Sequence, residues 1–275
     1  MLRQNQLRPF LKWAGGKSKL IPQYIRYFPQ KVTRYHEPFL GGGAVFFYLH
    51  SIQTFEDVFL TDINFNLVNT YLAVKHDVET VIILLEKHQA NHSKEYYYYV
   101  RSLKIDNFVE QAARLIYLNK TCFNGLYREN AQGNFNVPLG KYKNPLICNP
   151  ELLHLVSQAL QFAQITVQPF EAVLDSANTP EDFVYFDPPY YPVSNTSNFT
   201  AYSRESFSQN DQIRLRDIFA LLAHRGVKVM LSNSDCSFIR QLYSDFNLHE
   251  IKAARAINSN ALKRGKVSEV LVTSY

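Results

Sequence analysis

Short apolar runs alternate along the chain with longer segments whose apolar residues recur every three or four positions. The short runs are typical of buried strands, and the longer period is typical of helices that cover a sheet. We predict helices that begin near Ala44 and Pro150 and another at 211–224. Strands are predicted at 58–60, 165–168, 183–186 and 227–231, with one more ending near 37–39. Two last strands, 248–253 and 267–273, are close enough to pair antiparallel, so the predicted fold class is α/β with a mainly parallel sheet and a terminal antiparallel hairpin.

A mostly helical insert interrupts this alternation. From 66 to 122 the apolar period is helical, without strong strands. The segment 124–142 that follows is rich in Gly, Asn and Pro, which predicts a hairpin or a long loop. At Asn149-Pro150 a capping residue and a proline start a new helix. We therefore predict a discontinuous domain and one inserted domain, formed by residues 1–64 with 150–275 and by residues 65–149.

The composition predicts a packed globular chain. Of the 275 residues 46% are hydrophobic and 14% aromatic, which excludes a disordered chain. The longest aliphatic run, 81–85, is too short for a membrane span, and the first residues lack the apolar core of a secretory signal. Three widely spaced cysteines match neither a disulfide framework nor a metal site, and the histidines show no ligand spacing. We expect a cytoplasmic protein that needs no metal.

Basic residues are concentrated near the two ends of the chain. Residues 1–36 contain eight Lys or Arg and no acidic residue, although the net charge of the chain is only +5. Residues 252–266 contain five more, again without an acid. If the fold brings these blocks together, they attract phosphate groups; if it does not, they are two solvated surface segments. Charge alone leaves both readings open.

A glycine cluster follows the first predicted strand. Glycines at 41–43, between a strand and a helix, let the backbone approach a ligand closely. Asp62 comes about twenty residues later, at the end of the next strand, where a carboxylate can bind ribose hydroxyls. A tight turn without a ligand is the alternative. The cluster together with the acid favours an adenosine-containing ligand.

The segment Lys12 to Ser18 is similar to an ATP phosphate loop but does not match it. The phosphate loop requires a glycine where this chain has Leu11, and no strand precedes the segment. Trp13 lies between Lys12 and Lys17 and beside two glycines, which suits an anionic, aromatic ligand as well as a half-buried surface anchor.

The strongest local motif is Asp187-Pro188-Pro189-Tyr190, directly after an apolar strand. Two prolines turn the chain out of the sheet and fix the directions of the Asp carboxylate and the following carbonyls. Two fixed acceptors beside an aromatic ring can bind both hydrogens of an amino group and stack the ring that carries it. A Pro-Pro turn with a surface tyrosine is the alternative. We expect Ser232-Asn233, after a later strand, to line the floor of the same pocket.

Six segments in this order resemble the Dam family of DNA adenine-N6 methyltransferases, and they span nearly the whole chain. They are FLKWAGGKSKL (10–20), EPFLGGGAVFF (37–47), LTDIN (60–64), NGLYRENAQGNFNVPLGKY (124–142), VYFDPPY (184–190) and NFTAY (198–202). The order of cofactor glycines, recognition insert and DPPY is that of the α group of amino-methyltransferases. The resemblance implies a class I methyltransferase fold with an inserted target-recognition domain.

The resemblance also implies roles for individual residues. S-adenosylmethionine would be held by Trp13, Lys17, Phe39, Gly41, Gly43, Asp62, Phe170 and Asp187. The catalytic motif would be Asp187, Pro188, Pro189 and Tyr190, with the flipped adenine stacked on the tyrosine ring. Double-stranded DNA, typically at GATC, would be contacted by Lys12, Phe123, Asn124, Leu126, Arg128, Pro138, Lys141, Tyr142 and, from a segment that closes over the base, Asn198.

The chain departs from the family pattern at two positions. Phe123 replaces a frequent tyrosine, so ring stacking is kept without the hydroxyl. Lys141 replaces a frequent arginine, which turns a forked contact into a point charge. Cytosine-N4 methylation uses the same acceptor chemistry, as does methylation of a glutamine amide, although the basic blocks disfavour a protein substrate. A catalytically silent DNA-binding relative is the remaining alternative, and we expect a monomer without an obligate protein partner.

Overall fold

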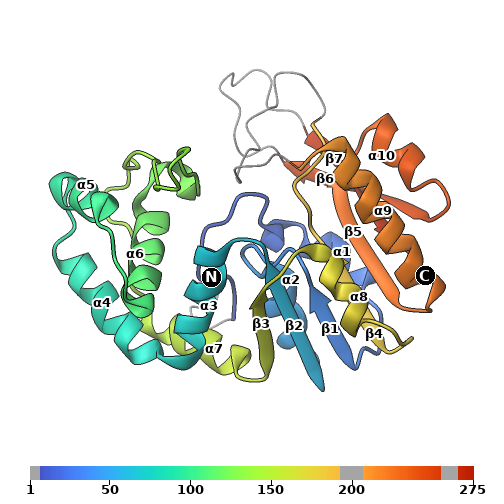
Figure 1. Cartoon of the computed structure of the whole chain (residues 1–275), viewed down its shortest axis with the longest axis horizontal. Coiled ribbons are helices and arrows are strands. Elements are labelled where there is room, and N and C mark those ends of the chain that lie inside the picture. Colours follow the sequence, from blue (N-terminus) through green and yellow to red (C-terminus); the bar gives the residue numbers. More distant parts are fainter. Residues whose placement is uncertain (1–6, 193–206, 255–265) are drawn as a thin grey trace.

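The computed structural model describes residues 7–192, 207–254 and 266–275. These residues contain one seven-stranded sheet in the order β3-β2-β1-β4-β5-β7-β6 (Figure 1). The strands from β3 to β5 are parallel, and β7 runs antiparallel to both of its neighbours. In chain order they are β1 Arg34–Glu37, β2 Asp57–Asp62, β3 Ala163–Val167, β4 Asp182–Phe186, β5 Lys228–Ser234, β6 Asn247–Ala254 and β7 Lys266–Thr273. The predicted α/β class and the terminal antiparallel pair are confirmed.

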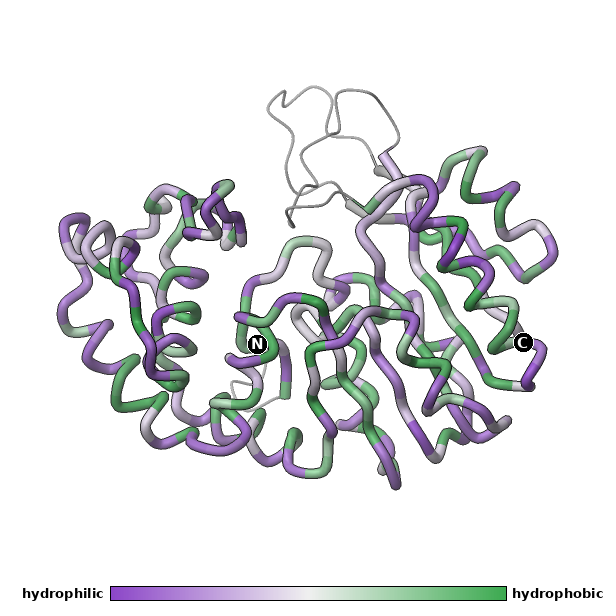
Figure 2. Tube along the Cα trace, viewed as in Figure 1, coloured by the Kyte–Doolittle hydropathy of each residue, from purple (hydrophilic) through white to green (hydrophobic). Residues whose placement is uncertain are grey.

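Two hydrophobic cores lie on opposite faces of this sheet, because side chains alternate along each strand. On β4, Phe183 and Tyr185 join one core while Val184 and Phe186 join the other. The central strands are buried on both faces, as expected for parallel strands covered by helices. In Figure 2 hydrophobic residues dominate the middle of the central strand β5, and they alternate with hydrophilic residues along the helices.

The helices between β2 and β3 form a group beside the sheet, drawn at the left of Figure 1. They are α3 Phe65–His76, α4 Val78–Ala90, α5 Lys94–Ser102 and α6 Phe108–Thr121, followed by α7 Pro150–Leu160. Each begins at a side chain that accepts a backbone N–H, as helix starts require: Asn64, Asp77, Ser93, Asn107 and Asn149. The helix α3 packs against β2 and β3 as well as against α6 and α7, so it joins the group to the sheet.

The segment between α6 and α7 contains a loop, residues 122–142, rather than a regular hairpin. Two isolated antiparallel bridges, Cys122 with Leu139 and Glu129 with Phe135, hold it together. A short 3-10 turn, η3 Phe123–Gly125, opens it, and Asn124 there has the left-handed φ of 56°. We refer to residues 122–142 as the bridged loop.

The remaining helices are mostly short. They are η1 Lys17–Lys19, α1 Ile21–Tyr24, η2 Ile25–Tyr27, α2 Ala44–His50, η4 Phe170–Ala172, α8 Val173–Ser176, α9 Gln209–His224 and α10 Ser237–Leu242. The start of α2 at Ala44 and the end of α9 at His224 agree with the prediction, and α9 begins two residues earlier than predicted. None of the described helices is long and apolar enough to cross a membrane.

The end of β5 was predicted wrongly. Ser232 and Asn233 lie inside β5, which continues to Ser234, and not after the strand. Their polar side chains end the apolar run, but their backbones pair with Leu271 and Val270 of β7. Pairing with a distant strand therefore extends β5 beyond its hydrophobic segment.

Candidate active site

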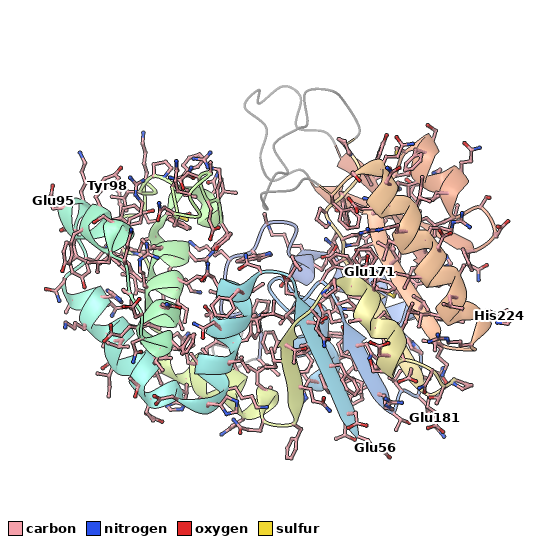
Figure 3. The ribbon with its side chains drawn as sticks, viewed as in Figure 1. Glu56, Glu95, Tyr98, Glu171, Glu181 and His224 are labelled. Atoms are coloured by element: carbon pink, nitrogen blue, oxygen red, sulfur yellow. The ribbon has the colours of Figure 1, made fainter. Side chains whose placement is uncertain are left out.

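The predicted site segments meet at one edge of the sheet. The glycine turn follows β1, Asp62 ends β2 and the DPPY motif follows β4; since these strands are parallel neighbours, their carboxyl ends share an edge. Glu56 and Glu181, which precede β2 and β4, lie at the opposite edge (Figure 3). The structure therefore brings together the two motifs on which the sequence argument depends.

The glycine turn is held by hydrogen bonds at both the N–H and the carbonyl of Gly41. Gly41 and Gly43 have left-handed φ values of 48° and 65°. The N–H of Gly41 donates to Oδ2 of Asp62 at 3.1 Å, and its carbonyl accepts from the Tyr71 hydroxyl at 3.1 Å. A Cβ on Gly41 would lie 3.0 Å from Cδ1 of Trp13, so the glycine lets Trp13 cover the turn. Burial raises the pKa of Asp62, partly offset by backbone N–H donors from Asn64 and Gly41.

Two phenylalanines predicted to contact the cofactor lie next to each other. The rings of Phe39 and Phe170 stack with their centroids 5.4 Å apart and an interplanar angle of 23°. Phe207 contacts both rings, and the Arg214 guanidinium lies over Phe170 at 5.7 Å. Together they give the edge of the site an aromatic wall that can stack a planar base.

The Asp187 carboxylate is held through one of its oxygens. Oδ1 accepts from the ammonium of Lys17 at 2.8 Å and from the Ser232 hydroxyl at 2.8 Å. Ser232 in turn lies 3.0 Å from the Tyr185 hydroxyl, so a buried chain of donors orients the group. Within residues 7–192, 207–254 and 266–275 no donor reaches Oδ2. The carboxylate thus has a fixed direction and an oxygen that can accept a further hydrogen bond.

Three buried polar side chains hold the backbone that follows Asp187. Gln212 of α9 donates to the Pro189 carbonyl at 3.0 Å and accepts from Asn233 at 2.9 Å. Asn233 accepts from the Tyr191 N–H at 3.1 Å, and Ser234 donates to the Tyr191 carbonyl at 2.6 Å. The turn is therefore positioned by β5 and α9 as well as by its own two prolines.

The ring of Tyr190 is anchored at its hydroxyl end. Its OH donates to Oε2 of Glu269 on β7 at 2.7 Å, and the Lys17 ammonium lies 4.6 Å from its ring centroid. Burial raises the pKa of Glu269, opposed by the nearby positive charge of Lys17. Lys17 therefore offsets part of the negative charge that Asp187 and Glu269 bring to the site.

A further buried acid lies beneath the glycine turn. Oε2 of Glu37 accepts from the Tyr35 hydroxyl at 2.8 Å and from the N–H of Phe46, in the first turn of α2, at 3.2 Å. Burial raises the pKa of Glu37 to about 8, and the charge of Asp187 adds to the rise. Glu37 connects β1 to α2 and thereby holds the two ends of the glycine turn.

Comparison with known proteins connects this geometry to a family. The family model for D12 class N6 adenine-specific DNA methyltransferases matches residues 13–257. The chain belongs to this family. It is 45% identical to the Type II methyltransferase M1.LlaDCHI of Lactococcus lactis subsp. cremoris, over 100% of this chain and 99% of that protein. It is also 37% identical to the DNA adenine methylase of Escherichia coli strain K12, over 96% of this chain and 94% of that one.

The chain is therefore an adenine-specific DNA methyltransferase with the class I methyltransferase fold, and DNA is its substrate. This decides between adenine and the cytosine alternative, which the chemistry of the acceptors alone leaves open.

The residues predicted to contact DNA lie mostly on the bridged loop of this methyltransferase. Phe123 is 49% exposed and Tyr142 is 39% exposed. Lys12 approaches the loop from the N-terminal motif, with its ammonium 4.0 Å from the Tyr142 ring centroid and 3.2 Å from the Lys120 carbonyl. The exposed Arg128 donates to the side chain of Asn136 at 2.7 Å. Asn124, Pro138 and Lys141 are also exposed, Leu126 is half-buried, and Asn198 lies outside the described residues.

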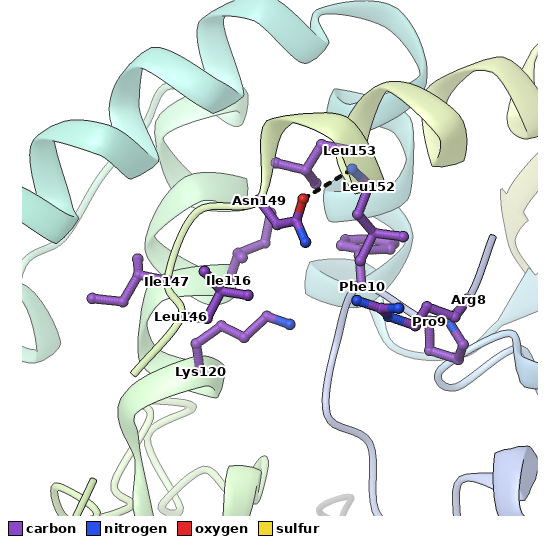
Figure 4. Close-up of a pocket in the computed structure, with 10 residues that line it drawn as sticks. All are labelled: Arg8, Pro9, Phe10, Ile116, Lys120, Leu146, Ile147, Asn149, Leu152 and Leu153. Atoms are coloured by element: carbon purple, nitrogen blue, oxygen red, sulfur yellow. Dashed lines mark hydrogen bonds between the residues drawn. The ribbon is translucent and has the colours of Figure 1, made fainter. Parts of the chain in front are cut away.

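Two basic residues line a pocket near the bridged loop. Figure 4 shows it between the start of the described chain, α6 and the segment that leads into α7. Arg8 and Lys120 are its basic residues. Burial, together with the charges of Lys12 and Arg8, lowers the pKa of Lys120 to about 8. Arg8 and Lys12 of the N-terminal basic block therefore lie close enough to Lys120 of α6 for their charges to act on it.

Several residues that build the site have no signal in the sequence. Gln212 and Glu269 hold the DPPY segment from α9 and β7, while Tyr127, Glu129 and Asn66 connect the bridged loop to α3 and Trp13. Tyr127 and Glu129 lie inside the quoted 124–142 motif, but the residue types alone do not indicate their partners.

Proposed function

We propose that this methyltransferase transfers a methyl group from S-adenosylmethionine to N6 of an adenine that is flipped out of duplex DNA, within the sequence GATC. The observation that carries the proposal is the Asp187 carboxylate, fixed by Lys17 and Ser232 at the sheet edge that also carries the glycine turn, with the Lys17 ammonium against the Tyr190 ring. The target sequence rests on the resemblance of the 124–142 motif.

The residues at the sheet edge fit S-adenosylmethionine. The turn at Gly41 has no room for a side chain and is bonded to the Asp62 carboxylate, which can still accept from ribose hydroxyls. Phe39 and Phe170 would line the adenine, and Trp13, Gly43 and Lys17 would contact the rest of the molecule. When bound, this cofactor supplies a methyl group activated by a sulfonium charge.

The DPPY segment makes a weak nucleophile reactive by orienting it. The lone pair of adenine N6 is delocalised into the ring, so hydrogen bonds from the amino group to two acceptors are needed to direct it. We assign these to the Asp187 carboxylate and the Pro188 carbonyl, with Tyr190 stacking the base. The carboxylate also stabilises the charge that develops on N6. Because these groups are fixed before the base arrives, orientation supplies much of the rate.

We also propose that catalysis and DNA recognition are carried out by two different parts of the chain. Residues 1–64 and 150–275 would form the catalytic domain, and residues 65–149 the domain that recognises DNA. Flipping a base out of the stack costs a few kcal/mol, which contacts of the bridged loop and the basic residues would offset. Arg128 and Lys12 are our candidates for contacts to base edges. A monomer is sufficient for these roles.

A methyl-transfer assay tests the proposal. Tritium-labelled S-adenosylmethionine is incubated with the protein and with matched duplexes that contain either GATC or a permuted sequence. We expect label in the adenine of the GATC duplex and little in the control. Transfer to adenine at another sequence would reject the GATC assignment alone. Absence of transfer to any duplex would reject the proposed cofactor or the proposed site.

A further inference from the structure

We propose that Tyr127 is a positioning residue that couples cofactor binding to DNA recognition, an inference that rests on the proposed function. Tyr127 lies on the bridged loop between two residues predicted to contact DNA, and its ring contacts Trp13, which covers the glycine turn. The physical link is a side-chain contact between two segments more than a hundred residues apart in the sequence.

The first part of the link is Trp13, which lies between the glycine turn and Tyr127. A Cβ added at Gly41 would lie 3.0 Å from Cδ1 of the indole, and one added at Gly42 would lie 3.3 Å from Cβ of Trp13, so the Trp13 side chain packs directly on the turn. On its other side the indole stacks on the Tyr127 ring, with centroids 5.3 Å apart and an interplanar angle of 29°. A shift of the turn or of the indole is therefore transmitted to Tyr127.

The second part is a hydrogen-bond cluster at the Tyr127 hydroxyl. The hydroxyl donates to Glu129, and the side-chain amide of Asn66 reaches both the hydroxyl and Oε1 of Glu129 at 3.1 Å. Asn66 is in the first turn of α3, whose cap Asn64 donates its N–H to Oδ1 of Asp62 at 2.9 Å. The acid proposed to bind the cofactor ribose is thus connected to the same tyrosine by a second route.

The other end of the link is the loop segment that carries Arg128. Tyr127 is 5% exposed and packs edge-on against Phe135 at 5.9 Å, while Glu129 bridges to Phe135 across the loop. Arg128 lies between these two anchored residues and is exposed. The position of its backbone, and hence the reach of its side chain, depends on where Tyr127 is held.

Such a link makes the two binding events interdependent. If the cofactor stabilises the observed position of Trp13, it also stabilises the loop arrangement that binds the specific duplex, and by linkage the duplex strengthens cofactor binding by the same factor. A purely structural Tyr127 would support the loop without making one affinity depend on the other. The two roles therefore differ in a ratio of affinities and not in activity.

The test is a thermodynamic cycle. The dissociation constant of S-adenosylhomocysteine, which has no methyl group to transfer, is measured by calorimetry with and without a saturating GATC duplex. For the unaltered protein we expect the duplex to tighten binding roughly tenfold, within the usual range of coupling between sites. Tyr127→Ala should bring this factor below about twofold while the affinity without DNA stays within about twofold. Tyr127→Phe, which keeps the ring and loses the hydroxyl, should give an intermediate factor.

Tyr99→Ala is the matched control, because Tyr99 is a 59% exposed tyrosine on α5 whose ring contact is with Tyr96. It should leave the coupling unchanged. The proposal is overturned if the unaltered protein shows no coupling, or if Tyr127→Phe and Tyr127→Ala both keep the full factor. It is also overturned if Tyr127→Ala weakens both affinities equally and leaves their ratio intact. No binding of the analogue by the unaltered protein would instead reject the proposed cofactor and, with it, this inference.

Discussion

The DPPY segment and the bridged loop differ in how the fold holds them. The segment after β4 is fixed by side chains from η1, α9, β5 and β7, and the polar groups Gln212, Ser232 and Asn233 among them are fully buried. The bridged loop has two isolated bridges, and its predicted DNA contacts Phe123 and Tyr142 are 49% and 39% exposed. The first region is held by a buried polar network, whereas the second joins the core through Cys122, Tyr127 and Val137 and keeps its predicted DNA contacts exposed.

This difference follows from what each region has to do. Acceptors that orient a reacting nitrogen are most effective when they do not have to reorganise, so they belong in a buried, fully bonded network. Side chains that read a duplex must remain accessible, and they can adjust when the duplex arrives. Substitutions in the first region should therefore change the rate of methyl transfer, and substitutions in the second should change the choice of DNA.

The largest effect is expected for Asp187→Ala. Loss of the fixed carboxylate should lower the rate of methyl transfer by at least about 100-fold, because charge developing on N6 is no longer stabilised. Affinity for DNA should be retained, since the loop is unchanged. Single-turnover transfer and a gel-shift titration measure the two quantities separately. Asp175→Ala, at an exposed position of α8, makes the same change in charge and should leave both intact. Full activity of Asp187→Ala would reject the assigned role.

A smaller loss of rate is expected for Glu269→Ala. Without the hydrogen bond to its hydroxyl, the Tyr190 ring is less well oriented, and misplacement of a stacked substrate can lower the rate about tenfold or more. Glu269→Gln keeps an acceptor for the hydroxyl and should recover most of the rate. We expect kcat to fall and the KM for DNA to change little. If the Gln variant is as impaired as the Ala variant, the hydrogen bond is not what matters.

In the bridged loop, Arg128→Ala should change the choice of DNA sequence. If Arg128 contacts a base edge, its removal should reduce discrimination between GATC and altered duplexes roughly tenfold or more, with less effect on nonspecific affinity. Lys141→Ala is the matched change on the same loop; as a point charge it should weaken all duplexes uniformly and reduce the salt dependence of binding. Filter binding to GATC and permuted duplexes at several salt concentrations separates the two patterns. A uniform loss for Arg128→Ala would make it a phosphate contact.

The same contrast explains how much the sequence could predict. The glycine turn, Asp62 and DPPY are local motifs at the ends of predicted strands, and the parallel topology brings them to one edge. The start of α2 after its glycines and the capped start of α7 at Pro150 likewise have their signals within a few residues. These features needed no knowledge of distant contacts.

Other features depend on contacts between distant segments. Gln212 and Glu269 lie on elements that follow the DPPY motif in the chain and reach it only through the packing of α9 and β7. Asn233 continues β5 because Val270 pairs with it, although its polarity ends the apolar run. Short helices such as α1 and α10 contain too few residues to show a period. For all of these, the deciding partner is far away in the sequence.

For Glu37→Gln the expected change is in stability and not in methyl transfer or in the choice of DNA, and it tests whether this buried acid makes the stability of the fold depend on pH. Burial raises the pKa of Glu37 to about 8. At pH values between its ordinary pKa and 8, Glu37 is therefore protonated in the folded protein and ionised in the unfolded chain. Across this range the free energy of unfolding falls as the pH rises, by at most about 1.4 kcal/mol per pH unit. The glutamine is neutral throughout and can accept from Tyr35 and Phe46 through its amide oxygen. The unfolding temperature of the variant should therefore rise relative to that of the unaltered protein between pH 5 and 8. A difference in unfolding temperature that does not change with pH would contradict this.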